Sequence, residues 1–292
     1  MTRLFPLFVL LALVACNGAD RVLGNNKRKD ASSYSYACLD SSLAGNQTGR
    51  TIDRATSVIR DLAVSKRSIT DSVETAWGAA FHKDMVEEGG LKLIPDAALD
   101  ARLNGVLARL LEQRSEPSGV RYRVYAVDDT VVNAYTFGGN IYVTRAMLDR
   151  CGQDEALLYA IIGHEVGHTE SGHIKATIQE MELSEKLFGE GGGTAFELKR
   201  LLTASFNQRN ELEADYYGIN LTNRLGFDLC TVVSFWKEMA SRENGYSKVE
   251  DFFRTHPFSE ARAECLSQHI RKNFGKDCGA LNKDASLPQV TK

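Results

Sequence analysis

The stretch Ile161-Ile162-Gly163-His164-Glu165-Val166-Gly167-His168 decides the fold of this 292-residue chain. His164 and His168 are four residues apart, so on a helix they project from one face, because four residues advance by about 400°. Two neutral imidazoles placed in this way can hold one Zn²⁺ and leave room for a third ligand and a water. Glu165 is rotated by about 100° from His164 and can reach that water as a general base. The pattern indicates a metallopeptidase site, and the alternative is a surface helix with two ordinary histidines.

An apolar run at residues 156–162 leads into this motif and shows where its helix comes from. The helix is expected to begin near Asp154 and to continue to about Phe188. Residues 189–193 read Gly-Glu-Gly-Gly-Gly and break the helical pattern. This break is interpreted either as a plain connector or as a mobile lid.

The first residues are typical of an export signal. Arg3 supplies positive charge, and residues 4–15 form a largely apolar run that is too short to span a bilayer, which needs about 20 residues. The run ends Leu13-Val14-Ala15-Cys16, which resembles a bacterial lipobox, where the signal is cut before Cys16 and the cysteine is acylated. A plain secretory signal with a chance cysteine is the alternative. By resemblance to bacterial lipoproteins, Asn17 favours the outer membrane.

These features suggest a division of the chain into a signal peptide (1–15), a polar lipid tether (16–50), a peptidase domain with N-terminal helices (51–280) and a tail (281–292). The formal net charge of −3 is near neutral for this size, so no nucleic-acid partner is expected. No other stretch approaches about 18 uninterrupted apolar residues. The mature protein is therefore expected to contact the membrane through its lipid only.

Six cysteines are present, and five remain if Cys16 carries lipid: Cys38, Cys151, Cys230, Cys265 and Cys278. None forms a C-x-x-C pair, which argues against a cysteine zinc site. Export would place them in an oxidising compartment. Cys265 and Cys278 close a short loop and are the predicted disulfide, with Cys38 to Cys151 or Cys230 as the second choice. Because five is odd, at least one thiol should stay free or pair between chains.

Periodicity predicts a small sheet among helices. Residues 120–127 alternate as in a half-exposed strand. Residues 131–137 and 141–144 are joined by Gly138-Gly139-Asn140, which predicts a hairpin. Helical stretches are expected ahead of the sheet at residues 51–63, at residues 69–85 and after Pro95-Asp96.

His173 is the nearest candidate for a third ligand. It lies nine residues after His164, about 900° round a continuous helix, and so on the opposite face. We therefore expect His173 to be a surface residue and not a ligand, unless the helix breaks right after His168.

Glu211 and Asp215 are better candidates, because they are four residues apart and share a helix face. Glu213 lies about 200° from Glu211 and should point away. One of the two carboxylates can bind the metal while the other holds the second nitrogen of a ligating imidazole. Ala214 between them would allow a close helix–helix approach. The alternative is an ordinary charged helix face.

Taken together, these motifs resemble the HtpX-like and CAAX-prenyl-protease-like family of zinc metalloendopeptidases. H-E-x-x-H at 164–168 is followed by Glu211-x-x-Ala214-Asp215, as in that family. Asn133-Ala134-Tyr135 resembles its N-A-[FY] segment, and His256-Pro257 with Arg262 resembles its H-P-x-x-x-x-R segment. The resemblance covers roughly residues 51–275. The layout is most similar to the lipidated, exported members that lack membrane spans.

The resemblance implies a role for each of these residues. One Zn²⁺ per chain would be held by His164, His168 and Glu211. Glu165 would be the base, and Asp215 would support a ligand from behind. His256 would either stabilise the oxyanion or close over the zinc in a latent state. Arg262 would position the region of His256 or Asp215.

The fold class implied is α+β, mainly helical and zincin-like, with the H-E-x-x-H helix packed beside a small sheet. An edge strand of that sheet would receive the substrate peptide in extended form. The resemblance places this strand at Asn133, Ala134 and Tyr135, with the glycine-rich hairpin near residues 137–142 as the edge.

The function implied is a zinc endopeptidase of the bacterial periplasm, anchored to the outer membrane by lipid. Its substrates would be unfolded, misfolded or misassembled envelope proteins, and the envelope assembly machinery is a candidate partner. The alternative is a lipoprotein that acts mainly as a chaperone or assembly adaptor. Every catalytic position is present, which favours the peptidase, since a pseudo-enzyme would be expected to lack Glu165 or a ligand.

Overall fold

The computed structural model describes residues 34–39, 68–87, 89–188, 207–242, 256 and 260–278, and all of these belong to the unit that spans Ser32–Lys292. The lipobox cysteine Cys16, the helix expected at 51–63 and the glycine-rich stretch at 189–193 lie outside the described residues. Within the described ranges, no helix is both long and apolar enough to cross a lipid bilayer.

Helix α7 (Glu155–Glu170) carries the H-E-x-x-H motif and begins where the sequence predicts, because the Asp154 side chain accepts a hydrogen bond from the main-chain N–H of Leu157. Every residue from Ala156 to Thr169 is buried, so this helix is surrounded on all sides. The helix ends at Glu170, not near Phe188. Gly172 has φ 77°, a left-handed conformation that interrupts the ladder, and α8 (His173–Phe188) begins anew.

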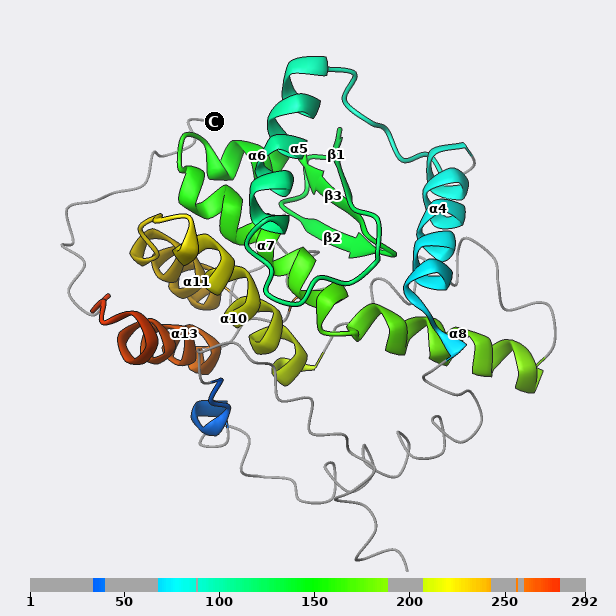
Figure 1. Cartoon of the computed structure of the whole chain (residues 1–292). Helices are drawn as coiled ribbons and strands as arrows, with labels where there is room; N and C mark the ends of the chain where they lie inside the picture. Colours follow the sequence, from blue (N-terminus) through cyan, green and yellow to red (C-terminus); the bar gives the residue numbers. More distant parts are fainter. Residues whose placement is uncertain are drawn as a thin grey trace, which may run out of the picture. The chain divides into compact units, whose positions relative to one another are not determined.

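Helix α10 (Gln208–Arg224) runs alongside α7, as Figure 1 shows. The two backbones approach closely at Gly163 and Gly218, since a Cβ atom added at Gly218 would lie 2.6 Å from the main-chain nitrogen of His164. Ala214 allows the same approach one turn away, because a Cβ added at Gly167 would lie 2.8 Å from its carbonyl oxygen. Small residues at these positions let the two sets of polar side chains meet between the helices.

The sheet has three strands in the order β1-β3-β2. The strands are β1 (Arg123–Val127), β2 (Ala134–Phe137) and β3 (Asn140–Thr144), with β1 parallel and β2 antiparallel to β3. The predicted hairpin is confirmed, and its turn contains Gly138 and Gly139 at φ 58° and 87°. The edge expected near residues 137–142 needs correction: Tyr142 lies on the central strand, and β2 alone forms the edge on this side.

Both faces of the sheet are covered. One face packs on α7 and on α5 (Ala97–Leu111), whose predicted start is confirmed by Asp96 accepting hydrogen bonds from the next turn. The other face packs on α4 (Asp71–Glu87) and α8. The described residues also contain α6 (Arg145–Cys151), α11 (Cys230–Arg242) and α13 (Glu260–Phe274). Helix α13 packs on α10 and α11.

The disulfide predicted between Cys265 and Cys278 is wrong. The structure pairs Cys38 with Cys265 and Cys230 with Cys278, at Cα–Cα distances of 5.6 and 5.1 Å. Helix α13 runs on from Cys265 to Phe274, about 13 Å further along the axis. That length exceeds the spacing a disulfide can bridge. The pairing of Cys38 with Cys151 or Cys230 is also wrong, and Cys151 is a buried free thiol.

Candidate metal centre

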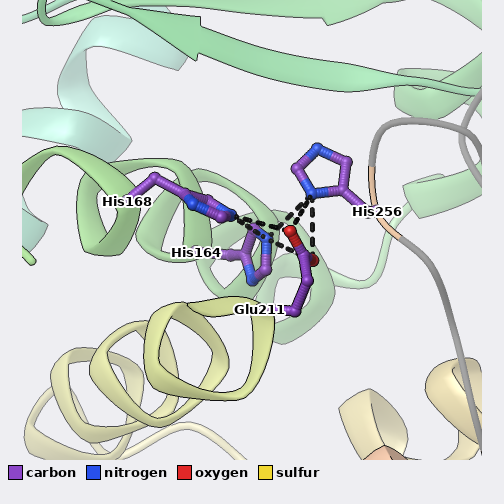
Figure 2. Close-up of side chains that lie close together, drawn as sticks. All are labelled: His164, His168, Glu211 and His256. Carbon is purple, nitrogen blue, oxygen red and sulfur yellow. Dashed lines mark hydrogen bonds and ion pairs between the residues drawn. The ribbon is translucent and has the colours of Figure 1, made fainter. Parts of the chain in front are cut away.

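Four buried side chains bring their polar atoms together between α7, α10 and the loop position 256. His164, His168, Glu211 and His256 each offer one ligand atom, and these four atoms lie within 4.8 Å of one another (Figure 2). The Nε2 atoms of His164 and His168 are 3.0 Å apart, and the Glu211 carboxylate lies 3.6 and 3.4 Å from them. Nδ1 of His256 lies 3.2 Å from Nε2 of His164 and 3.1 Å from Oε2 of Glu211.

This donor set fits a divalent metal ion. Three imidazole nitrogens and one carboxylate oxygen are ligands that Zn²⁺ and related first-row metals prefer. The four residues are at most 4% exposed, so water screens the charge of the carboxylate little. A cation of this kind would supply the positive charge that a buried carboxylate needs. The structure brings together His164, His168 and Glu211, the three residues predicted as ligands, and places His256 beside them.

Asp215 supports this cluster from behind, one turn after Glu211. Its Oδ1 lies 2.8 Å from Nδ1 of His164, the ring nitrogen that faces away from the other ligand atoms. A carboxylate at this position fixes the orientation of the ring and leaves Nε2 available to a metal. Trp236 on α11 donates to the same carboxylate oxygen over 3.1 Å, and the sequence held no signal for that contact.

Arg262 at the start of α13 connects the carboxylates of Glu211 and Asp215. It donates to both oxygens of Asp215 over 2.7 and 3.0 Å, and its Nη1 lies 3.0 Å from Oε2 of Glu211. Its side chain is completely buried. The structure therefore places Arg262 beside Asp215, in the region where the resemblance expected it.

The charges of the cluster determine its protonation. Burial would raise the pKa of Glu211, but His256, Arg262 and His168 outweigh it and hold that pKa well below its ordinary range. Burial likewise opposes ionisation of Asp215, yet Arg262 and the hydrogen bond with His164 keep its pKa lowered. Burial lowers the pKa of His168 far below its usual value, despite the attraction of Glu211. An ionised Glu211 and a neutral His168 are the forms that bind metal.

Glu165 differs from the other carboxylates of the centre. Burial raises its pKa, although His256 and His164 oppose the shift. Its Oε1 lies 3.6 Å from Nε2 of His256, and its Oε2 is buried with no hydrogen-bond partner among the described residues. Such an orphaned oxygen costs free energy unless a ligand or water contacts it, and a raised pKa suits a general base near neutral pH.

His256 contacts both the cluster and the sheet. Its Nε2 donates to the main-chain carbonyl oxygen of Ala134, 3.0 Å away on the edge strand β2. Burial would lower its pKa, but Glu211 and Glu165 raise it to about 9. Of the segment expected to hold substrate, Ala134 and Tyr135 lie on β2. Asn133 immediately precedes that strand and exchanges hydrogen bonds with Thr144.

The prediction that His173 lies on the surface is wrong. His173 is only 7% exposed, and its Nδ1 lies 3.1 Å from Nδ1 of His168. The reason is the break at Ser171 and Gly172, which ends the helical geometry on which the expectation depended. Gly172 in the sequence was the signal that could have indicated it.

Comparison with known proteins identifies the family of this chain. Residues 97–270, which contain all the residues of the cluster, match "Peptidase family M48". The chain belongs to peptidase family M48. It is therefore assigned to the metallopeptidases by its sequence, and the matched residues include a buried cluster that could hold a metal ion.

Individual relatives share less than 30% of their aligned residues with this chain. The chain is 29% identical over 190 residues to "Metalloprotease LoiP" of Escherichia coli, which covers 59% of this chain and 69% of that protein. It is 24% identical over 193 residues to the "Beta-barrel assembly-enhancing protease" of E. coli, and 25% identical over 205 residues to the "Mitochondrial metalloendopeptidase OMA1" of Schizosaccharomyces pombe. These matches cover 60% and 65% of this chain, but only 39% and 58% of the two relatives.

Proposed function

We propose that this chain is a zinc-dependent endopeptidase in which His164, His168 and Glu211 hold the metal. The observation that carries the proposal is the convergence of these buried ligand atoms beside Glu165, whose Oε2 has no hydrogen-bond partner among the described residues. Zinc is favoured over harder cations because imidazole nitrogens dominate the donor set. Family membership supports the same reaction class.

Each residue of the centre has a separate task in peptide hydrolysis. Zinc, when bound, would act as a Lewis acid and lower the pKa of water. Glu165 accepts the proton of the attacking water and passes it to the leaving amine. Asp215 and Arg262 keep His164 and Glu211 in place. The outer edge of β2, where His256 contacts the carbonyl oxygen of Ala134, would pair with the substrate main chain in extended form.

The proposed substrates are unfolded or misassembled proteins of the bacterial envelope. A β-edge recognises main-chain groups, which a folded substrate does not present but an extended segment does. Two disulfides in the described residues are consistent with an oxidising compartment. One relative is named "Beta-barrel assembly-enhancing protease", which describes that protein as enhancing beta-barrel assembly.

Cleavage and metal content test the catalytic part of this proposal together. Purified wild-type protein is expected to contain about one zinc per chain and to cleave an unfolded protein such as casein. Glu165→Gln should keep the zinc and the fold but lose roughly 10²–10⁴ in turnover, because it removes only the base. Glu264→Gln, at an exposed position of α13, is the matched control and should match wild type.

Two results would count against the peptidase. Near-normal cleavage by Glu165→Gln would exclude Glu165 as the base. A wild-type protein that binds zinc and suppresses aggregation of unfolded proteins, without cutting them, would support the chaperone or adaptor function instead.

We also propose that the mature protein is anchored to the outer membrane through a lipid on Cys16 and faces the periplasm. The support is the sequence Leu13-Val14-Ala15-Cys16 and the Asn17 that follows. Metabolic labelling with palmitate should mark the wild type and not Cys16→Ala. An unlabelled, freely soluble wild type would contradict the lipid anchor.

A further inference from the structure

The two histidines of the H-E-x-x-H motif are each held by a second polar group, but the groups differ. The ring of His164 faces Glu211 through Nε2 and Asp215 through Nδ1. The ring of His168 likewise faces the other ligand atoms through Nε2, which lies 3.4 Å from Oε1 of Glu211. Its Nδ1 faces not a carboxylate but His173, the first residue of α8.

His173 reaches this position because α7 ends at Glu170, three residues before it. Ser171 caps α7, Gly172 takes a left-handed conformation, and the chain starts α8 in a new direction. The ring of His173 then lies edge-on to that of His168, with the ring centroids 5.1 Å apart. Both side chains are buried.

The positions of the nitrogens allow one arrangement of protons for a metal-bound His168. A ligating nitrogen must carry a lone pair, so Nε2 of His168 is bare and Nδ1 carries the hydrogen. That hydrogen points at Nδ1 of His173, 3.1 Å away, which must therefore be the acceptor. The hydrogen of His173 is then on Nε2, which lies 3.7 Å from Oε2 of Glu213.

Glu213 thus lies at the far end of this chain of contacts. It was expected to point away from the metal, and it does so, but toward His173. Its side chain is 25% exposed, so Glu213 lies between His173 and the solvent. The carboxylate attracts the Nε2–H of His173 and so favours the tautomer that accepts from His168.

We propose that His173 and Glu213 are positioning residues that fix the ring and tautomer of His168, as Asp215 does for His164. The inference depends on the proposed zinc site. It assigns a function to the break between α7 and α8, since a continuous helix would carry His173 to the opposite face. Removing such outer partners typically costs 10- to 100-fold in metal affinity.

Two substitutions of His173 separate orientation from packing. His173→Asn keeps an acceptor close to the position of Nδ1, whereas His173→Phe keeps the ring volume and removes the acceptor. In chelator competition, His173→Phe is expected to bind zinc 10- to 100-fold more weakly. His173→Asn should recover most of the affinity. The visible absorption of the Co²⁺-loaded protein should change in His173→Phe and resemble wild type in His173→Asn.

Glu213→Gln provides a variant at a partly exposed position if His173→Phe does not fold. We expect weaker zinc binding than in wild type, near the low end of the same range, and a lower kcat at unchanged KM. Glu264→Gln is the matched control on an exposed helix face and should leave both values unchanged.

The outcomes distinguish this inference from the proposed function. A wild type that binds no zinc would refute the zinc site itself. A wild type that binds zinc, with folded His173→Phe and Glu213→Gln variants of equal affinity and equal cobalt spectrum, would overturn the positioning role alone. If His173→Phe does not fold, wild-type affinity in Glu213→Gln would be enough to overturn it.

Discussion

The ring nitrogen Nε2 of His256 lies 3.0 Å from the main-chain carbonyl oxygen of Ala134, while Nδ1 of the same ring lies 3.2 Å from Nε2 of His164. The His256 side chain therefore forms a hydrogen bond with a carbonyl oxygen of the edge strand and also lies among the ligand atoms. A substrate in extended form would need that carbonyl, and an attacking water would need that position. This geometry favours the closed, latent arrangement over direct oxyanion stabilisation.

His256→Ala is accordingly expected to raise turnover with zinc retained. Losing a hydrogen bond worth about 0.5–1.5 kcal/mol would increase the open population roughly twofold to tenfold. Steady-state cleavage of casein measures the turnover, and parallel zinc analysis measures the metal content. His269→Ala is the control, because His269 is a buried histidine away from the ligand cluster. A fall of roughly 10²–10³ in kcat would show instead that His256 donates to the oxyanion.

Glu211→Ala should lose both metal and activity. Its carboxylate lies within 3.6 Å of both motif histidines and carries the only negative charge among the four grouped ligand side chains. Because removing an outer partner already costs 10- to 100-fold, loss of a ligand should cost at least about 100-fold in zinc affinity. Metal analysis after dialysis would decide, and full zinc occupancy in Glu211→Ala would rule out this ligand.

Glu74 on α4 predicts a pH dependence of stability. Its side chain is completely buried, both oxygens lack a hydrogen-bond partner among the described residues, and the Nζ of Lys175 is 3.9 Å away. Burial raises the pKa of Glu74 from 4.5 to about 8. Between these values the folded protein holds the proton more strongly than the unfolded chain, so stability falls as the pH rises through this range.

Glu74→Gln should remove that fall. Below pH 4.5 the variant and the wild type should be similar in stability, and above pH 8 the variant should be more stable by at most about 5 kcal/mol. Urea unfolding at several pH values measures the difference. Parallel curves for the two proteins at every pH would show that Glu74 is already ionised in the folded state.

The disulfide pattern gives a prediction that needs no enzyme assay. Peptide mapping without reduction should find Cys38 linked to Cys265 and Cys230 linked to Cys278. Replacing Cys38 by serine should lower the free energy of unfolding by about 2–5 kcal/mol. Burial raises the pKa of the Cys151 thiol to about 12, so alkylating reagents should label it only after unfolding. A peptide that joins Cys265 to Cys278 would contradict the structure.

Local sequence was sufficient for several elements. The Asp96 and Asp154 caps start α5 and α7 where the sequence predicts, because capping depends on residues within one turn. The two glycines at 138 and 139 predict the hairpin for the same reason. The spacing of four in both 164/168 and 211/215 places each pair on one helix face, whatever the helices pack against.

Tertiary structure decided the rest, because it depends on distances between segments far apart in the chain. Helix periodicity alone could not say whether Glu211 or Asp215 faces the metal; the close approach of α10 to α7 at Gly163 and Gly218 directs Glu211 to the Nε2 side of His164 and Asp215 to its Nδ1 side. The partners of Cys265 and of His256 likewise follow only from packing. The position of His173 could not be predicted from helix periodicity, because Gly172 takes a left-handed conformation and interrupts the helix. The side chain expected on the surface therefore lies next to His168.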